Sequence, residues 1–190
     1  MPTSATRHAA LLAALCLAHA SARHADAQPT PLARHSVFAE VLGNAAGPLS
    51  LNYDRRLGAG RASVRVGVAG WETSCSGGGG FLGCDEESSS SYWTVPLLLN
   101  ALTGAGTHHL EFGAGVLGAH RSFTRAARGT TESSTALVLT GTVGYRRQRP
   151  GRGLVLRVTA TPSYGFGGAG AAYPGDGLLM LAGLGLGYSF

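Results

Sequence analysis

The chain has 190 residues, of which 30 are glycine and 13% are charged, and its formal net charge is +5. This length fits one domain, and the glycine content disfavours a helical protein because each interior glycine costs a helix about 1 kcal/mol relative to alanine. The arginines are scattered along the chain rather than clustered, so the positive charge does not indicate a nucleic-acid-binding protein.

The N-terminus has the pattern of an export signal. Arg7 and His8 form a short basic region, and an apolar run follows from Ala9 to Ala18. Cleavage is expected after Ala27, so residues 1–27 are predicted to be a signal peptide and 28–35 a short lead-in. Cys16 does not make this a lipoprotein signal, because the residue before it, Leu15, is large.

The remainder of the chain shows the two-residue alternation of β-strands. Read against glycine, proline and serine clusters, this alternation predicts eight strands. They run over residues 36–44, 48–57, 61–71, 92–101, 108–120, 134–147, 153–165 and 177–190. We assign residues 36–190 to a single domain. No segment has the run of roughly 20 apolar residues that a membrane helix needs.

The lengths of the connectors alternate along the chain. Short connectors follow the second, fourth and sixth strands, whereas the connectors after the third, fifth and seventh are long and span 72–91, 122–133 and 166–176. Outer-membrane β-barrels have short turns at the periplasmic end and long loops outside. This alternation of short and long connectors predicts that both termini lie in the periplasm. The connector Ala45–Gly47 is shorter than the pattern predicts for an external loop.

Each strand has one apolar and one polar or glycine-rich face. In the seventh strand Leu154, Leu156 and Val158 share a face, and Arg157 and Thr159 lie on the other. A membrane barrel has this polarity, with lipid outside and a polar lumen. Aromatic residues are expected in two girdles. Their members are Tyr53, Tyr145 and Tyr188 at the periplasmic end, and Trp71, Tyr92, Trp93, Tyr164 and Phe166 at the outer end. The pairs Arg55–Arg56 and Arg146–Arg147 are expected at head-group depth.

The inward-facing positions include several charged residues, namely Glu40, Asp54, Arg65, Glu111 and Arg157. An eight-stranded barrel is just wide enough for side chains to fill, and unpaired charges there are costly. We therefore expect a network of ion pairs that fills the lumen. The alternative is a narrow path for ions or protons.

Cys75 and Cys84 lie in the first long loop. An exported chain meets an oxidising compartment, so a disulfide between them is expected. A zinc site is disfavoured because two cysteines do not supply a full ligand set. The sequence indicates neither a metal nor a cofactor.

The last strand ends in an alternation of large residues, Leu184, Leu186, Tyr188 and Phe190. With the export signal, this strand resembles the closing strand of small bacterial outer-membrane β-barrel proteins, of the eight-stranded, OmpA-like and OmpX-like, barrel-only type. The resemblance spans about Val37 to Phe190. It implies an all-β, antiparallel, up-and-down transmembrane barrel in the cell outer membrane, in contact with lipid and lipopolysaccharide. It also implies that the barrel-assembly machinery recognises the last strand.

The function expected from these features is structural or interactive, with the long loops presented outside to a ligand that the sequence does not identify. One alternative is an exported soluble barrel that holds a small apolar ligand. Another is a lipid-modifying hydrolase. His120-Arg121-Ser122 superficially resembles the His-x-Ser element of outer-membrane lipid A deacylases, with Glu132 as the nearest loop carboxylate. That family carries its element near the end of the chain, whereas three more strands follow here. We therefore expect no enzymatic activity.

Overall fold

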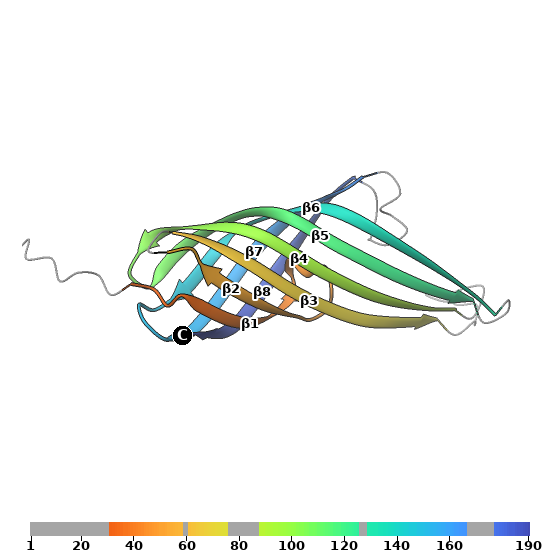
Figure 1. The fold of residues 1–190 in the computed structure, drawn as a ribbon, viewed down its shortest axis with the longest axis horizontal. Helices are drawn as coiled ribbons and strands as arrows, with labels where there is room; N and C mark the ends of the chain where they lie inside the picture. The colour runs from red at the N-terminus through yellow and green to blue at the C-terminus, as the bar shows by residue number, and fades with distance from the viewer. Residues whose placement is uncertain (1–30, 59–60, 76–87, 126–128, 167–176) are drawn as a thin grey trace, which may run out of the picture. The chain divides into compact units, whose positions relative to one another are not determined.

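The computed structural model describes residues 31–58, 61–75, 88–125, 129–166 and 177–190. Eight strands form a closed barrel in which each strand pairs antiparallel with its sequence neighbours and β1 pairs with β8 (Figure 1). The strands are β1 (His35–Leu42), β2 (Ser50–Arg56), β3 (Ala62–Cys75), β4 (Ser88–Ala105), β5 (His108–Arg125), β6 (Thr130–Gln148), β7 (Gly153–Gly165) and β8 (Gly177–Ser189). The predicted eight-stranded up-and-down topology is confirmed.

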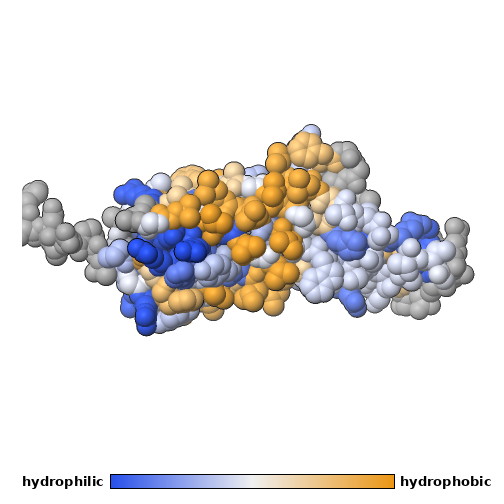
Figure 2. Space-filling model, viewed as in Figure 1, coloured by the Kyte–Doolittle hydropathy of each residue, from blue (hydrophilic) through white to orange (hydrophobic). Residues whose placement is uncertain are grey.

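The two faces of the barrel wall differ in polarity. Along β7, Leu154 and Val158 are 67% and 53% exposed on the outside, whereas Arg157 between them is 1% exposed. The alternation follows from the strand itself, since successive side chains point to opposite faces. Apolar side chains gather over the middle of the barrel wall, between more hydrophilic ends (Figure 2). No helix among the described residues is long and apolar enough to cross a membrane.

The barrel closes at the end where β1 begins and β8 finishes, which we call the terminal rim. The backbone amide of His35 donates to the carbonyl of Phe190 over 3.1 Å, and the amide of Phe190 donates to the carbonyl of His35 over 2.8 Å. The His35 and Phe190 rings also stack, with their centroids 5.7 Å apart. At this rim Ala105 pairs with His108, so Gly106 and Thr107 form a two-residue hairpin loop. Gly106 has the positive φ, 67°, that such tight loops require.

Four strands continue past the opposite end, the distal rim. β3 pairs with β2 only as far as Ala69 and β6 pairs with β7 only as far as Val138, yet β3 continues to Cys75 and β6 begins at Thr130. β4 and β5 have 18 residues each and β6 has 19, against 8 for β1 and 7 for β2. We call the part of β3–β6 beyond the distal rim the extended sheet; in Figure 1 it points to the right.

The prediction of long loops at 72–91 and 122–133 is therefore wrong for much of their length. Residues 72–75, 88–91, 122–125 and 130–133 are paired strand. They are rich in Ser, Thr, Arg and Glu rather than alternating apolar residues. These segments lack the alternation of apolar and polar residues from which strands are predicted, although the backbone pairing continues. The third predicted loop, 166–176, lies outside the described residues after Phe166.

The connector between β1 and β2 also differs from the prediction. β1 ends at Leu42, and Gly43–Ala45 form a 3-10 turn, η1, whose residues are buried. Leu42 and Ala46 on either side have positive φ values of 58° and 54°, which are unfavourable for residues with a Cβ. The backbone thus turns sharply on both sides of a segment that folds into the barrel instead of forming an external turn.

A side chain at Gly187, in the β1–β8 pair that closes the barrel, is expected to lower the stability of the protein. Gly187 faces Phe38 of β1, and a Cβ at Gly187 would overlap the carbonyl oxygen of Val37 and the backbone of Phe38. We expect Gly187→Ala to lower the free energy of unfolding by about 1–3 kcal/mol, measured by urea titration in detergent. Gly118→Ala is the matched control, because its Cβ would lie 3.9 Å from the nearest atom, the carbonyl oxygen of Val95. Equal stability of both variants would contradict the packing seen at this seam.

Candidate functional site

The lumen contains a connected group of charged side chains near the middle of the barrel. The Arg157 guanidinium donates through Nε and Nη2 to the two carboxylate oxygens of Glu111, over 2.9 and 2.7 Å. Arg157 Nη1 lies 3.6 Å from Glu40 Oε1, and Arg65 Nη1 lies 3.9 Å from the same oxygen. The Phe38 ring lies near both arginines, with the Arg157 Cζ atom 4.4 Å and the Arg65 Cζ atom 6.0 Å from its centroid. All four charged side chains are fully buried.

A second charged pair lies closer to the terminal rim. Arg146 Nη1 donates to Asp54 Oδ2 over 3.0 Å, and Arg146 Nη2 donates to the hydroxyl of Ser36 over 2.9 Å. The hydroxyl of Ser63 donates to the same carboxylate oxygen over 3.2 Å. The placement of Arg146 at head-group depth was therefore wrong. Its position directly after the outward-facing Tyr145 places it on the lumen face, and strict alternation from Tyr145 could have identified it.

The structure thus places Glu40, Asp54, Arg65, Glu111 and Arg157 in the lumen and adds Arg146 to them. Among the described residues the buried lumen charges are three arginines and three carboxylates, so they sum to zero. Buried charges are tolerated when each is paired and hydrogen-bonded. The bidentate pair of Arg157 with Glu111 is the strongest geometry available to these groups. The network occupies the centre of the barrel with balanced charge.

The buried side chain of Asn44, in η1, makes a set of hydrogen bonds that the sequence did not indicate. Its amide nitrogen donates to the hydroxyl of Thr140 over 2.8 Å and to the carbonyl of Gly141 over 2.7 Å. Its amide oxygen accepts from the hydroxyl of Thr142 over 2.7 Å and from Nη2 of Arg65. One buried side chain therefore joins the β1–β2 connector to β6 and to the charged network.

The bond from Asn44 to Gly141 compensates for a local break in the sheet. Pairing between β6 and β7 skips residues 141–142 and 161–162. Pro162 lies opposite Gly141, with its Cγ 3.3 Å from where a Gly141 Cβ would be, and proline has no N–H to donate. A buried carbonyl without a hydrogen-bond donor is costly. Asn44 supplies the missing donor from inside the barrel.

Apolar side chains pack together in the lumen on the distal side of the charged network. Leu117, Ala119 and Val138 form a buried cluster, and Ala46 and Leu179 pack against it. The hydroxyl of Thr94 donates to the carbonyl of Ala45 over 2.7 Å and holds the connector across this cluster. Together, η1 and the cluster form what we call the plug, which separates the charged network from the distal rim.

The predicted outer aromatic girdle divides into two groups. Trp93, Tyr164 and Phe166 face outward and are 59%, 48% and 52% exposed. Trp71 and Tyr92 lie on the inner face of the extended sheet and stack on each other, with centroids 4.9 Å apart and planes within 5°. The prediction was wrong for these two residues, which form a ring pair beside the connector rather than a lipid anchor.

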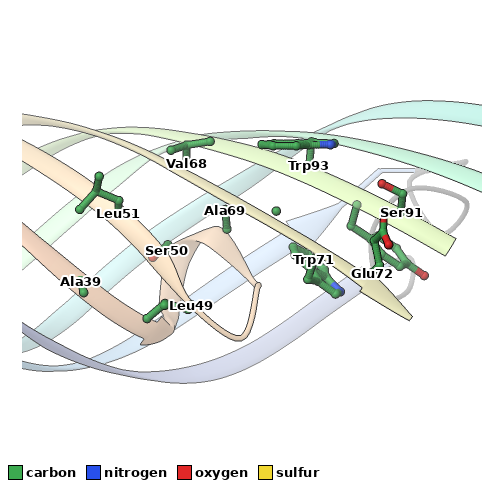
Figure 3. Close-up of a pocket in the computed structure, with 12 residues that line it drawn as sticks. Ala39, Leu49, Ser50, Leu51, Val68, Ala69, Trp71, Glu72, Ser91 and Trp93 are labelled. Atoms are coloured by element: carbon green, nitrogen blue, oxygen red, sulfur yellow. The ribbon is translucent and has the colours of Figure 1, made fainter. Parts of the chain in front are cut away.

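A groove of about 470 Å³ lies at the distal rim beside this ring pair (Figure 3). It exists because β2 begins at Ser50 while β3 continues past it, which leaves a step in the barrel wall. Leu49, Leu51 and Val68 line the part toward the barrel, and Glu72 and Ser91 line the end along the extended sheet, at the right in Figure 3; Trp71 and Trp93 also line it. Trp93 packs over Gly70, where a Cβ would come within 3.1 Å of the indole.

The side chains of the predicted hydrolase element do not form a triad. His120 Nε2 lies 3.3 Å from the hydroxyl of Ser122, but His120 Nδ1 lies 3.0 Å from the hydroxyl of Thr135 instead of a carboxylate. Glu132 pairs in register with Phe123, which puts it on the opposite face from His120 and Ser122, and it contacts Arg125 at 3.4 Å. Among the described residues, His120 has no carboxylate to orient it as a general base.

Two other predictions involve residues that are not described. The signal peptide, residues 1–27, lies outside the described part of the chain, and so does Cys84, so the disulfide with Cys75 remains a prediction. Within the described residues no group of three or more His, Cys, Asp or Glu side chains could hold a metal ion.

Comparison with known proteins relates the chain to solved barrels by fold. No protein-family model matches the chain, and no curated protein does. The N-terminal β-barrel domain of Pseudomonas aeruginosa OprF superposes with a TM-score of 0.50 at 14% identity, over 86% of this chain and 100% of that one. The attachment invasion locus protein Ail of Yersinia pestis, in complex with the heparin analogue sucrose octasulfate, superposes with a TM-score of 0.46 at 13% identity, over 82% and 94%. A second Ail structure gives 0.45 at 14% identity, over 83% and 98%. By its closed eight-stranded topology, the chain has the fold of small outer-membrane β-barrels.

Proposed function

We propose that this protein is an integral outer-membrane β-barrel that anchors in lipid and presents the extended sheet as an interaction surface outside the cell. The observation that carries the proposal is the polarity of the wall. Leucine residues such as Leu178 and Leu184 are 72% and 62% exposed on the outside, whereas Arg65 and Glu111 inside are 0% exposed. A soluble barrel would bury its apolar residues and expose its charges. Lipid is the solvent that makes the observed arrangement stable.

The same polarity argues against the alternative of a soluble carrier. A carrier for a small apolar ligand needs an apolar interior. The centre of this lumen is occupied by Arg157, Glu111, Glu40 and Arg65 in direct contact with one another. The charged network is better explained as a filling that stabilises the barrel than as a binding site. The plug above it favours a closed lumen over an ion path.

The extended sheet supports the interaction role. Residues 70–75 of β3 and 130–137 of β6 each have one neighbouring strand among the described residues, so the sheet has two open edges. Open edges offer unpaired backbone donors and acceptors to a partner strand. The outer residues Leu184, Leu186, Tyr188 and Phe190 of the last strand would be the signal read by the barrel-assembly machinery. Lipopolysaccharide would surround the distal rim.

Cysteine labelling on intact cells tests this orientation. In a variant with Cys75 and Cys84 replaced by serine, Ser133→Cys places a thiol on the extended sheet, and Arg149→Cys places one at the terminal rim. We expect a membrane-impermeant maleimide to label the first on intact cells and the second only after the outer membrane is permeabilised. Labelling of both, or of Arg149→Cys alone, would overturn the proposed orientation.

A further inference from the structure

The terminal rim carries an excess of positive charge on its outside. The exposed acidic side chains that the structure describes, Glu72 and Glu132, both lie on the extended sheet. Strongly hydrophilic residues gather at the terminal end of the barrel wall, at the left in Figure 2. Six exposed arginines belong to the strand ends and connectors of this rim, namely Arg34, Arg55, Arg61, Arg147, Arg149 and Arg152.

A groove of about 240 Å³ at the β6–β7 hairpin brings three of these arginines together with apolar side chains. Its lining residues are Arg147, Arg149 and Arg152, which we call the groove arginines, and Gly153, Leu154 and Leu156. Arg147 pairs in register with Leu156, so their side chains are neighbours on the outer face of the wall. Leu154 and Leu156 are 67% and 41% exposed. The groove therefore joins a cluster of positive charge to the edge of the apolar band.

The guanidinium groups of the groove arginines are available to a ligand. Within the described part of the chain none of the three has a hydrogen bond or an ion pair, whereas Arg146 on the same strand as Arg147 binds Asp54 and Ser36. A guanidinium presents its N–H donors as a planar fork that matches the oxygens of a phosphate. The free donors and the positive charge both favour a phosphate group as the ligand.

The backbone that carries Arg149 and Arg152 is held by the segment before β1. The amide of Gly151 donates to the carbonyl of Pro31 over 3.0 Å, and Leu32 forms β-bridges with Pro150 and Gly151. Gly151 has the positive φ, 73°, of a tight turn. The two arginines therefore flank a turn whose backbone is already ordered, which reduces the entropy lost when both bind one ligand.

From these features we infer that the groove is a binding site for an anionic phospholipid in the periplasmic leaflet of the outer membrane. The phosphate accepts from the groove arginines, and an acyl chain lies on Leu154 and Leu156 and continues along Val158, the next outward-facing residue of β7, which is 53% exposed. The volume equals that of roughly eight water molecules at about 30 Å³ each, which suits a head group rather than a whole lipid. A free phosphate would contact the arginines and leave the leucines of the groove without a partner. This inference rests on the proposed function, because it requires the terminal rim to lie at the periplasmic surface of the membrane.

A fluorescent reporter beside the groove tests the preference for an anionic lipid. Trp71→Phe and Trp93→Phe remove the two native tryptophans, and Val158→Trp places a single tryptophan on the wall where the acyl chain would lie. The protein is reconstituted in vesicles of equal parts phosphatidylglycerol, which is anionic, and phosphatidylethanolamine, which has no net charge. Fluorescence-quenching bromines are placed on the acyl chains of one lipid or of the other, so that the membrane composition stays constant. We expect bromines on phosphatidylglycerol to indicate an occupancy about five-fold higher, equivalent to the roughly 1 kcal/mol that one arginine gains at an anionic membrane surface.

Two triple variants separate the groove from the general charge of the rim. Replacing all three groove arginines by glutamine should bring the ratio of the two quenching signals to about one, because the groups that bind the phosphate are gone. The matched control combines Arg34→Gln, Arg55→Gln and Arg61→Gln, which removes three exposed charges from the same rim but none from the groove. The control should keep the preference for phosphatidylglycerol.

The outcomes distinguish a failure of the lipid site from a failure of the proposed function. Equal quenching by the two brominated lipids, with the groove arginines present, would overturn the lipid site and leave the membrane barrel intact. Equal loss of the preference in the two triple variants would also overturn it, because the rim charge as a whole would then attract the lipid. If neither lipid quenches the Val158→Trp reporter in a folded protein, the barrel is not inserted, and the proposed function itself fails.

Discussion

Replacing Arg157 by alanine is expected to lower the free energy of unfolding by about 3–5 kcal/mol, because it leaves two buried carboxylates without their main partner. Glu111 loses both of its bonds to the guanidinium, at 2.9 and 2.7 Å, and Glu40 loses a contact at 3.6 Å. The change is measured by urea titration of the refolded protein in detergent. We also expect no new conductance in planar bilayers, since the plug lies between the network and the distal rim.

Two variants make this result specific. Arg125→Ala removes an arginine from the exposed pair with Glu132, whose side chains are 36% and 68% exposed, and should cost about 0–1 kcal/mol. Glu111→Gln combined with Arg157→Ala should cost less than the sum of the two single changes, because the pair is coupled. If Arg157→Ala is as stable as Arg125→Ala, or if it conducts, the lumen network is not a structural filling.

Replacing Asn44 by alanine has the second-largest expected effect, a loss of about 2–4 kcal/mol. Four hydrogen bonds disappear, and the carbonyl of Gly141 and the guanidinium of Arg65 lose a partner inside the barrel. Buried groups left without partners cost about 1–3 kcal/mol each. Part of this cost is recovered because the variant no longer has to order the strained connector between Leu42 and Ala46.

Asn52→Ala is the matched control for Asn44. Asn52 is equally buried at 1% exposure, but the structure gives its side chain one hydrogen bond, from Nδ2 to the hydroxyl of Ser50 over 2.9 Å. We expect it to cost about 1 kcal/mol. Equal losses for the two variants would show that Asn44 does not hold the connector in the lumen.

The barrel and its faces could be predicted because a wall with an apolar outer face and a polar lumen imposes a strict alternation on the sequence. Residues such as Leu154, Arg157 and Val158 must alternate when one face meets hydrocarbon and the other a filled lumen. The same alternation of inward- and outward-facing residues predicted that Glu40, Asp54, Arg65, Glu111 and Arg157 lie on the inner face, and they are buried there in the structure. Which charges pair could not be predicted, because pairing depends on register and barrel closure between distant strands. Asp54 pairs with Arg146, 92 residues away in the sequence.

The features that were missed lie where this pattern stops. The strands continue to Cys75 and from Thr130 in segments rich in serine and threonine, so no alternation of apolar and polar residues marks them. Asn44 sits in a short connector whose inward fold is set by distant contacts, Thr140 and Gly141, rather than by local sequence. Trp71 and Tyr92 were expected among the lipid anchors because aromatic composition alone does not tell the inner face of a sheet from the outer.

Heat modifiability of the protein in the outer-membrane fraction tests the central claim most directly. Full-length protein is expressed, the outer membrane is isolated, and boiled and unboiled samples are compared on an SDS gel. We predict that the unboiled protein migrates differently from the boiled protein, and that deletion of Phe190 abolishes this shift because its contacts with His35 close the barrel. A soluble periplasmic protein that shows no shift would contradict the membrane barrel.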